Sequence, residues 1–173
     1  MKKTIIIFAS LFFCLPVNAK SISTYSPHEY IDNQYIMLKG IFHNLTITKR
    51  HNSEIRIMIP SDYGFQTGKF DLRRPMKDQL AVFADFLNTY PESTISIYGH
   101  TDNVGNSQSN MTLGLNRAIS VEKVLLSNNV NQFRLSTHSE GEEVPLCTNK
   151  TEKGRECNRR VEVILTLDKP ELF

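Results

Sequence analysis

Residues 45–60, LTITKRHNSEIRIMIP, alternate apolar and polar side chains on both sides of a polar break at residues 51–53. After the break, isoleucines occupy every second position, at Ile55, Ile57 and Ile59. A period of two is typical of a strand with one buried face, and a short polar break is typical of a turn. The segment therefore predicts a β-hairpin, with its histidine as an ordinary turn residue.

Two longer segments, residues 71–91 and 107–128, repeat apolar side chains every three or four positions instead. This spacing predicts two amphipathic helices, and Pro91 is expected to end the first of them. The apolar positions are Met76, Leu80, Phe83, Leu87 and Tyr90 in the first helix, and Met111, Leu115, Ala118, Val121 and Leu125 in the second.

Three short segments complete the pattern: STISIYG at 93–99, RLSTHS at 134–139 and RRVEVILTL at 159–167. Each is a strand candidate, and apolar residues alternate in the first and the last of them, at Ile95 and Ile97 and at Val161, Val163 and Leu165. The order is then hairpin, helix, strand, helix, strand, strand, which favours one layer of sheet covered by helices on one side. No repeat or linker divides residues 45–173, so a single domain is expected there.

The first nineteen residues, MKKTIIIFASLFFCLPVNA, show the three parts of a secretory signal peptide, with cleavage expected after Ala19. The apolar run from residue 5 to residue 15 is shorter than the roughly 20 residues that a spanning helix needs. A retained membrane anchor and a lipoprotein lipidated at Cys14 are the alternatives. The bulky Phe13 before that cysteine disfavours lipidation.

Residues 20–44 are expected to form an N-terminal extension. Ser26 is suited to cap a helix that starts at Pro27, and apolar residues follow at roughly helical spacing. The extension either packs on the domain or forms a short arm.

The whole chain has a net charge of +2, from 20 basic and 18 acidic residues. Cleavage after Ala19 would remove two lysines and no acid, leaving 18 residues of each sign. A balanced charge gives no general reason to expect nucleic-acid binding.

Beyond the signal, the cysteines are Cys147 and Cys157, close together in a polar segment. In an exported protein such an even pair favours a disulfide, which would contribute about 2–3 kcal/mol by closing the loop. Free thiols are the alternative. A zinc site would lack nearby histidines to complete its ligands.

An acid follows the strand predicted at 93–99, and a base lies inside the next helix. Thr101 and Asp102 fall in the loop, while Asn110 and Arg117, seven residues apart, share one face of the helix. Asp102 is suited to hold an ammonium group and the fork of Arg117 to bind a carboxylate. A ligand with both charges on one carbon fits this spacing, and an internal Asp102–Arg117 salt bridge explains it equally well.

Three blocks, GHTDNVGNSQSNMTLGLNRAISVEKVL, RLSTHSEGEEVP and NKTEKGRECNRRVEV, occur in order within about residues 55 to 167. Together they resemble the OmpA-like peptidoglycan-binding domain. The resemblance implies an α+β fold, a βαβαββ sandwich with a mixed sheet and helices packed on one side. It also implies a non-enzymatic periplasmic module, without cofactor or metal, that binds peptidoglycan by gripping the zwitterionic end of meso-diaminopimelate.

The resemblance assigns a role to each matched position. It makes Asp102 the acid and Arg117 the base of the grip, Thr101 and Asn110 supporting residues, Leu113 the apolar back of the pocket, Phe65 the aromatic of the loop before the first helix, and Arg159 and Arg160 the arginines of a closing NRRVE motif. Alternation along a strand places these two arginines on opposite faces.

The chain departs from the family pattern at Gln66, where a carboxylate is usual, and at Ser139-Glu140-Gly141, where Gly-aromatic-Gly is usual. These departures leave a second hypothesis open, a scaffold role among other proteins of a cell-envelope machine. A wall hydrolase that uses His100 and Asp102 with a nearby serine is disfavoured, because the sequence lacks a nucleophile-elbow or metal-ligand spacing.

Overall fold

The computed structural model describes residues 27–50, 53–66 and 68–167. The signal-peptide segment, Cys14, Ser26 and the turn at 51–52 lie outside the described residues. The elements follow in the order α1 (Pro27–Ile41), β1 (Thr46–Arg50), β2 (Glu54–Pro60), α2 (Ser61–Gly64), α3 (Arg74–Thr89), β3 (Ser93–His100), α4 (Ser107–Ser127), η2 (Gln132–Arg134), β4 (Leu135–Gly141), α5 (Glu152–Asn158) and β5 (Arg160–Leu167). No helix in these ranges is both long and apolar enough to span a bilayer.

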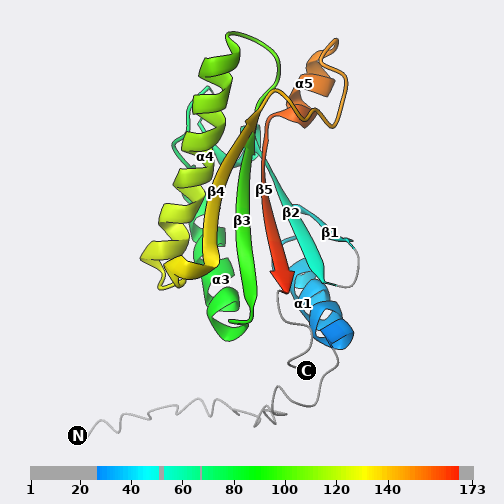
Figure 1. Cartoon of the computed structure of the whole chain (residues 1–173), viewed down its shortest axis with the longest axis vertical. Helices are drawn as coiled ribbons and strands as arrows, with labels where there is room; N and C mark the ends of the chain where they lie inside the picture. The colour runs from blue at the N-terminus through cyan, green and yellow to red at the C-terminus, as the bar shows by residue number, and fades with distance from the viewer. Residues whose placement is uncertain (1–26, 51–52, 67, 168–173) are drawn as a thin grey trace, which may run out of the picture.

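The strands form one five-stranded sheet in the order β1-β2-β5-β3-β4 (Figure 1). β1 pairs with β2, β2 with β5 and β5 with β3 in antiparallel fashion, whereas β3 and β4 are parallel. The predicted mixed sheet and the predicted hairpin are confirmed. The parallel pair is joined through α4, because parallel neighbours need a crossover connection.

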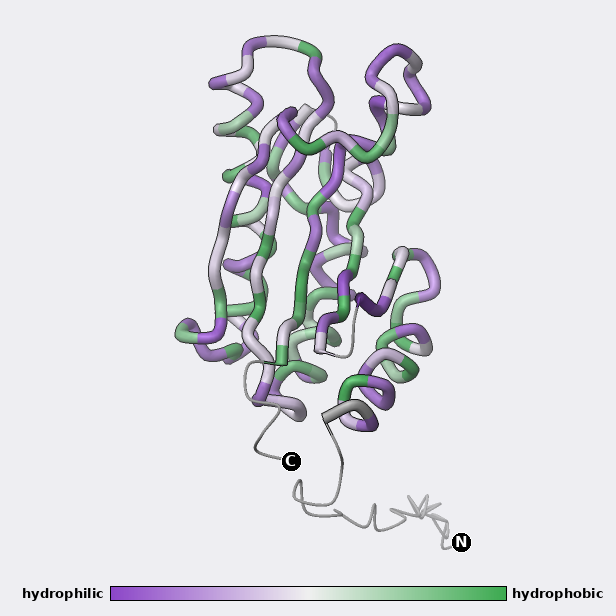
Figure 2. The backbone as a smooth tube through the Cα atoms, turned by 45° about the vertical axis from the view of Figure 1, so that its right-hand side comes forward, coloured by the Kyte–Doolittle hydropathy of each residue, from purple (hydrophilic) through white to green (hydrophobic). Residues whose placement is uncertain are grey.

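One face of the sheet is apolar, and it forms the core with the helices. Ile47, Ile57, Val163 and Ile97 lie opposite one another along neighbouring strands, and all four are buried. Buried side chains of α3 and α4 belong to the same cluster, and α1 contacts β1 and β2 beside them. Figure 2 shows the resulting alternation of hydrophobic and hydrophilic residues along the strands. Helices on one side of the sheet, as predicted, are confirmed.

Helix α4 differs from its predicted apolar stripe in its first half. Ala118, Val121 and Leu125 are buried as expected, but Leu115 is 38% exposed. Asn110 and Arg117 are buried in its place, together with Gly114. The N-terminal half of this helix therefore faces a polar region beyond the core.

Gly99 of β3 and Gly114 of α4 bring strand and helix into backbone contact. A Cβ on Gly99 would lie 1.9 Å from the carbonyl oxygen of Gly114, and a Cβ on Gly114 would lie 2.4 Å from Ser139 Oγ. Atoms of this kind do not approach so closely, so both positions require glycine. The contact fixes α4 against the end of β3 from which the loop with Asp102 leaves.

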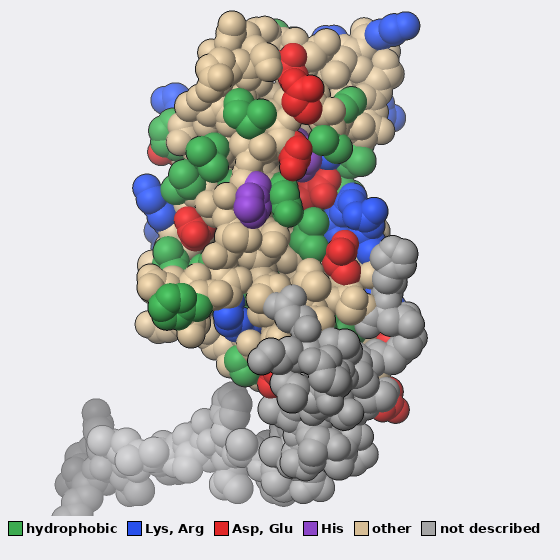
Figure 3. Space-filling model, in the orientation of Figure 1, with side chains coloured by type: hydrophobic (Ala, Val, Ile, Leu, Met, Phe, Trp, Pro, Cys, Tyr) green, Lys and Arg blue, Asp and Glu red, His purple; other side chains and the backbone are tan. Residues whose placement is uncertain are grey.

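The opposite face of the sheet is largely polar and open. Met58, Glu162, Tyr98 and His138 form a row across it, and the rings of Tyr98 and His138 stack at 4.9 Å. Figure 3, seen from this side, shows acidic, histidine and hydrophobic side chains interspersed.

Residues 142–158 cross the upper end of this open face, and α5 lies in them. Cys147 and Cys157 form the predicted disulfide. The Asn158 side chain also accepts hydrogen bonds from the N–H groups of Leu146 and Cys147, both at 2.9 Å. Sequence periodicity missed α5, because seven residues capped by Thr151 are too few to show a helical repeat.

Replacing Gly114 with alanine tests the backbone contact. An added Cβ must push α4 away from β3, and overpacking of this kind costs about 1–3 kcal/mol. We expect Gly114→Ala to lower the free energy of unfolding in urea by at least about 1 kcal/mol. Gly40→Ala is the control, since a Cβ there meets nothing within 4 Å, and it should be neutral or stabilising. Equal stabilities would contradict the contact's role.

Candidate functional site

A cavity of about 580 Å³ lies where the loop after β3 meets the N-terminal half of α4. We call it the ionic pocket. Its lining comes from six segments: Asp62 of α2, Gly68, the loop residues Thr101, Asp102 and Val104, the α4 residues Asn110, Leu113 and Arg117, the α5 residues Glu152 and Arg155, and Arg159 before β5. Segments far apart in sequence thus bring three carboxylates and three guanidinium groups together.

Asp102 is held in a fixed orientation at the end of β3. Its Oδ1 accepts a hydrogen bond from the N–H of Val104 at 3.1 Å, which closes a tight turn. Its Oδ2 accepts from Arg159 Nη1 at 2.8 Å. Gly105 supports the turn with a φ of 101°, a conformation that glycine adopts without strain. The carboxylate is thereby aimed into the pocket.

Asn110 and Thr101 fasten this loop to its surroundings. The Asn110 amide donates to the carbonyl oxygens of Asp102, at 3.3 Å, and Val104, at 3.2 Å. Thr101 donates through Oγ1 to the Asp102 carbonyl at 2.8 Å. Both side chains therefore hold the backbone of the loop that carries the acid, and their supporting role in binding stays a prediction.

Arg117 is only 3% exposed, yet its guanidinium is incompletely paired. Nε donates to the carbonyl oxygen of Lys69 at 3.1 Å, and the guanidinium lies over the Phe65 ring, 5.6 Å from its centroid. Nη1 is buried and has no hydrogen-bond partner among the residues that the structure describes. Burial lowers the pKa of this arginine and the nearby Asp62 opposes the shift, but the group stays charged at neutral pH.

Arg159 is the hub of the ion pairs. It contacts Asp102 Oδ2 at 2.8 Å, Asp62 Oδ2 at 2.9 Å and Glu152 Oε1 at 3.0 Å. The hydrogen bond to Asp62 makes the largest contribution to a raised Arg159 pKa. The internal salt bridge that the sequence allowed, Asp102 with Arg117, is absent among the described ion pairs. Asp102 pairs with Arg159 instead, so Arg117 has no carboxylate partner among the described ion pairs.

The OmpA family model matches residues 64–159, more than half of the chain and nearly all of the pocket lining. The chain belongs to the OmpA family. The family assignment agrees with the resemblance seen in the three sequence blocks.

The relatives of this OmpA-family chain include an outer membrane protein and two proteins of solved structure. The outer membrane protein Omp38 of Acinetobacter baumannii is 38% identical over 69% of this chain but only 32% of its own length, so the chain spans about a third of that relative. A solved MotB-like protein from Desulfovibrio vulgaris superposes with a TM-score of 0.71 at 26% identity, over 82% of this chain and 96% of that one. The peptidoglycan-associated lipoprotein from Burkholderia pseudomallei gives a TM-score of 0.56 at 27% identity, over 60% and 88%.

Some of the remaining predicted site residues line the ionic pocket, and others do not. Arg159 and Leu113 line the ionic pocket, and Phe65 lies fully buried under Arg117 without lining it. Arg160 does not reach the pocket: it lies on the open face of the sheet, where Nε donates to Glu162 at 2.7 Å. The strand alternation that made the two arginines diverge explains this placement.

Sequence reasoning missed Asp62, Glu152 and Arg155 of the pocket lining. Asp62 lies four residues before Gln66, the position at which the expected carboxylate is missing. The ionic pocket therefore does contain a carboxylate from this chain segment, that of Asp62, although Gln66 replaces the usual one. The available signal was the polar Asp62, two residues after the end of β2, since binding residues often lie in the segments that follow strands.

The hydrolase constellation is not assembled. His100 is buried on the open-face side, with Nε2 3.8 Å from Glu162 Oε1. Neither of its ring nitrogens makes a hydrogen bond within residues 27–50, 53–66 and 68–167. Asp102 faces the other way and binds Arg159. His100 instead belongs to a buried ionic cluster in which Arg56 and Arg160 flank Glu162, at 3.2 and 2.7 Å.

This cluster predicts an acid sensitivity of the fold. Burial lowers the pKa of His100 to about 4, and Arg160 adds to the shift. The unfolded chain has the ordinary value of about 6.5 and therefore binds a proton first as the pH falls. Stability is unaffected above pH 6.5 and declines from pH 6.5 to 4, by up to about 3 kcal/mol from this group.

Urea unfolding of the wild type and His100→Gln between pH 7.5 and 4 tests this expectation. The uncharged glutamine should remove this part of the slope, so the stability difference between the two proteins should shift in favour of the variant as the solution is acidified. A difference that does not change with pH would contradict the assignment.

Proposed function

We propose that this protein binds peptidoglycan non-covalently, by gripping the zwitterionic end of meso-diaminopimelate in the stem peptide. One observation carries the proposal: Arg117 lines the same cavity as the fixed carboxylate of Asp102, and its buried Nη1 has no hydrogen-bond partner among the described residues. An unpaired buried cationic donor is costly unless a ligand completes it. A ligand carboxylate would complete it.

The charge balance of the ionic pocket favours a zwitterion over a simple anion or cation. Three carboxylates and three guanidinium groups line it. A ligand with one charge of each sign preserves that balance, with its carboxylate on Arg117 and its ammonium group on Asp102. Arg159 then shares Asp102 with the ammonium group and keeps its own bonds to Asp62 and Glu152.

The relatives support a binding module of the bacterial envelope over an enzyme. One of the superposed structures is described as a peptidoglycan-associated lipoprotein, and the sequence relative Omp38 is described as an outer membrane protein. Together with the expected signal peptide, they support a location in the periplasm, in contact with the cell wall.

Removal of either charge should weaken binding to purified sacculi. A hydrogen bond to a charged group contributes about 1.5–3 kcal/mol, so Asp102→Asn and Arg117→Gln should each raise the dissociation constant at least tenfold. Sedimentation with sacculi and titration with a soluble stem peptide both measure this loss.

The matched controls are Asp78→Asn and Arg74→Gln. This exposed pair on α3, 3.0 Å apart, lies outside the lining of the ionic pocket, and its loss should leave binding unchanged. Circular dichroism and urea unfolding must show that all four variants are folded. Wild-type binding by both pocket variants would reject the proposed grip.

Comparison of two ligands tests the role of Arg117 alone. A stem peptide with lysine in place of meso-diaminopimelate keeps the ammonium group and lacks the carboxylate. The wild type should bind it at least tenfold more weakly, since one charge-assisted bond is lost. Arg117→Gln should bind both peptides with similar affinity. Undiminished discrimination by that variant would contradict the assigned contact.

A scaffold role in an envelope complex is favoured by one further feature. Ile36 and Met37 of α1 are 66% and 43% exposed, outside the segment matched to the family. This apolar surface does not line the ionic pocket, so contact with a partner protein there would accompany wall binding without replacing it.

A further inference from the structure

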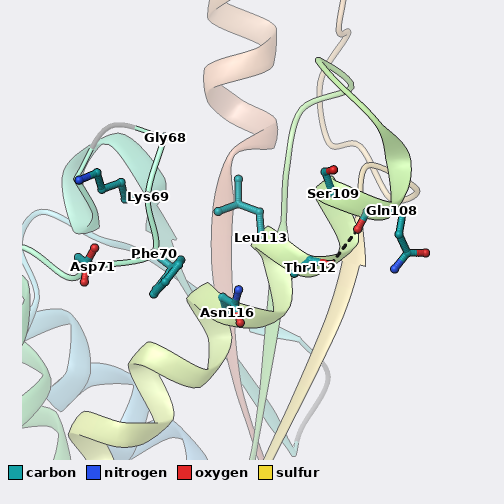
Figure 4. Close-up of a pocket in the computed structure, with 9 residues that line it drawn as sticks. All are labelled: Gly68, Lys69, Phe70, Asp71, Gln108, Ser109, Thr112, Leu113 and Asn116. Carbon is teal, nitrogen blue, oxygen red and sulfur yellow. Dashed lines mark hydrogen bonds between the residues drawn. The ribbon is translucent and has the colours of Figure 1, made fainter.

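A second cavity of about 570 Å³ adjoins the ionic pocket and shares Gly68 and Leu113 with it. We call it the side groove. It runs between the loop at 68–71 and the first turns of α4, and its volume lies within the range of about 300–1,000 Å³ of small-ligand sites. Figure 4 shows Phe70 on the loop side facing Leu113 and Asn116 on α4.

The loop presents Phe70 to solvent on a fixed turn. Phe65 and Leu72 form a bridge at its base, and Gln66 donates through its N–H to the Asp71 carbonyl at 3.0 Å. Gly68 turns the chain with a φ of 67°. Despite this order, 44% of the Phe70 side chain is exposed. An exposed aromatic ring beside the ionic pocket is a surface on which a flat apolar group can stack.

The helix side of the side groove supplies neutral hydrogen-bonding groups. Gln108, Ser109, Thr112 and Asn116 line it, all on α4. Thr112 donates to the Gln108 carbonyl at 2.9 Å, whereas the side-chain amides of Gln108 and Asn116 make no hydrogen bond within the described part of the chain. Amides of this kind can both donate and accept.

The side groove differs from the ionic pocket in charge. Its charged lining residues are Lys69 and Asp71, one of each sign. In Figure 4 the Lys69 side chain points away from α4, and Asp71 lies on the far side of Phe70 from that helix. The surface that remains consists of one aromatic ring, one leucine and neutral polar groups. It is suited to a neutral ligand with one apolar face and several hydroxyl or amide groups.

We propose that the side groove binds an amino-sugar ring of the peptidoglycan glycan strand while the ionic pocket holds the stem peptide. This inference rests on the proposed function, because the peptide is covalently attached to the glycan. The ring's apolar face stacks on Phe70, and its hydroxyl and acetamido groups bond to Asn116. An apolar acetamido methyl group contacts Leu113 at the junction of the two cavities.

The test compares three soluble ligands on the intact protein: a disaccharide-linked stem peptide, the same peptide without sugars, and the disaccharide alone. Calorimetry should show that the wild type binds the linked form about fivefold more tightly than the free peptide, a gain typical of one aromatic stacking contact. In NMR titration, the disaccharide alone should shift the signals of Phe70 and Asn116.

Phe70→Ala should bind the linked form no more tightly than the free peptide, with the affinity for the free peptide unchanged. Phe133→Ala is the matched control: this ring is 87% exposed on η2, beside Arg134, which bonds to the start of β3 away from the site. Equal wild-type affinity for the two peptides would overturn the proposal. So would an equal loss of both affinities in Phe70→Ala.

The ligands separate failure of the sugar subsite from failure of the peptide grip. If the free peptide does not bind, the proposed function fails, and the disaccharide titration alone still decides the subsite. If the free peptide binds and sugars add nothing, only the subsite fails. Unfolding curves of each variant exclude loss of fold as the cause.

Discussion

The site depends on how closely one helix can approach one strand. Gly99 and Gly114 let the backbones of β3 and α4 touch, and a methyl group on either would meet an atom at 1.9 or 2.4 Å. The core continues below this contact, through Ala118, Val121 and Leu125. Above it, the same helix directs Asn110 and Arg117 toward the loop that follows β3. Packing geometry, more than the sequence distance of acid and base, brings Asp102 and Arg117 into one cavity.

Burying Arg117 without a carboxylate partner is the main electrostatic cost of this arrangement. The Lys69 carbonyl and the Phe65 ring recover part of it, and Asp62 and Asp102 act at longer range. Arg159 prevents a simpler solution, because it binds both of these carboxylates. A direct ion pair between Arg117 and a carboxylate would stabilise the fold more. The Arg117 Nη1 donor, which has no partner among the described residues, is suited to bind a ligand carboxylate. The fold tolerates this donor because the neighbouring charges balance.

Strand and helix periodicity was sufficient to predict the hairpin, α3, α4, β3 and β5, because each buries a regular face in one core. The predicted strand β4 forms as well, although it buries no such face. The same rule failed for α5, which a disulfide and the Asn158 side chain hold in place of an apolar stripe. Periodicity also wrongly predicted Leu115 as a core residue, since spacing does not reveal where a helix leaves the core. Family resemblance assigned Asp102, Arg117 and Arg159 to one candidate site but did not predict which of them pair. The Asp102–Arg159 ion pair joins residues 57 positions apart, and no local pattern encodes such a contact.

We propose that the ionic pocket grips a zwitterion and that the side groove next to it binds a sugar. The first proposal rests on the Arg117 nitrogen that has no partner among the described residues. A crystal structure of the protein with a stem peptide containing meso-diaminopimelate is the most direct measurement of this claim. We predict a ligand carboxylate within hydrogen-bonding distance of Arg117 Nη1 and the ammonium group of the same carbon on Asp102. A peptide bound elsewhere, with Arg117 Nη1 still unpaired and Asp102 still bonded only to Arg159 and Val104, would contradict it.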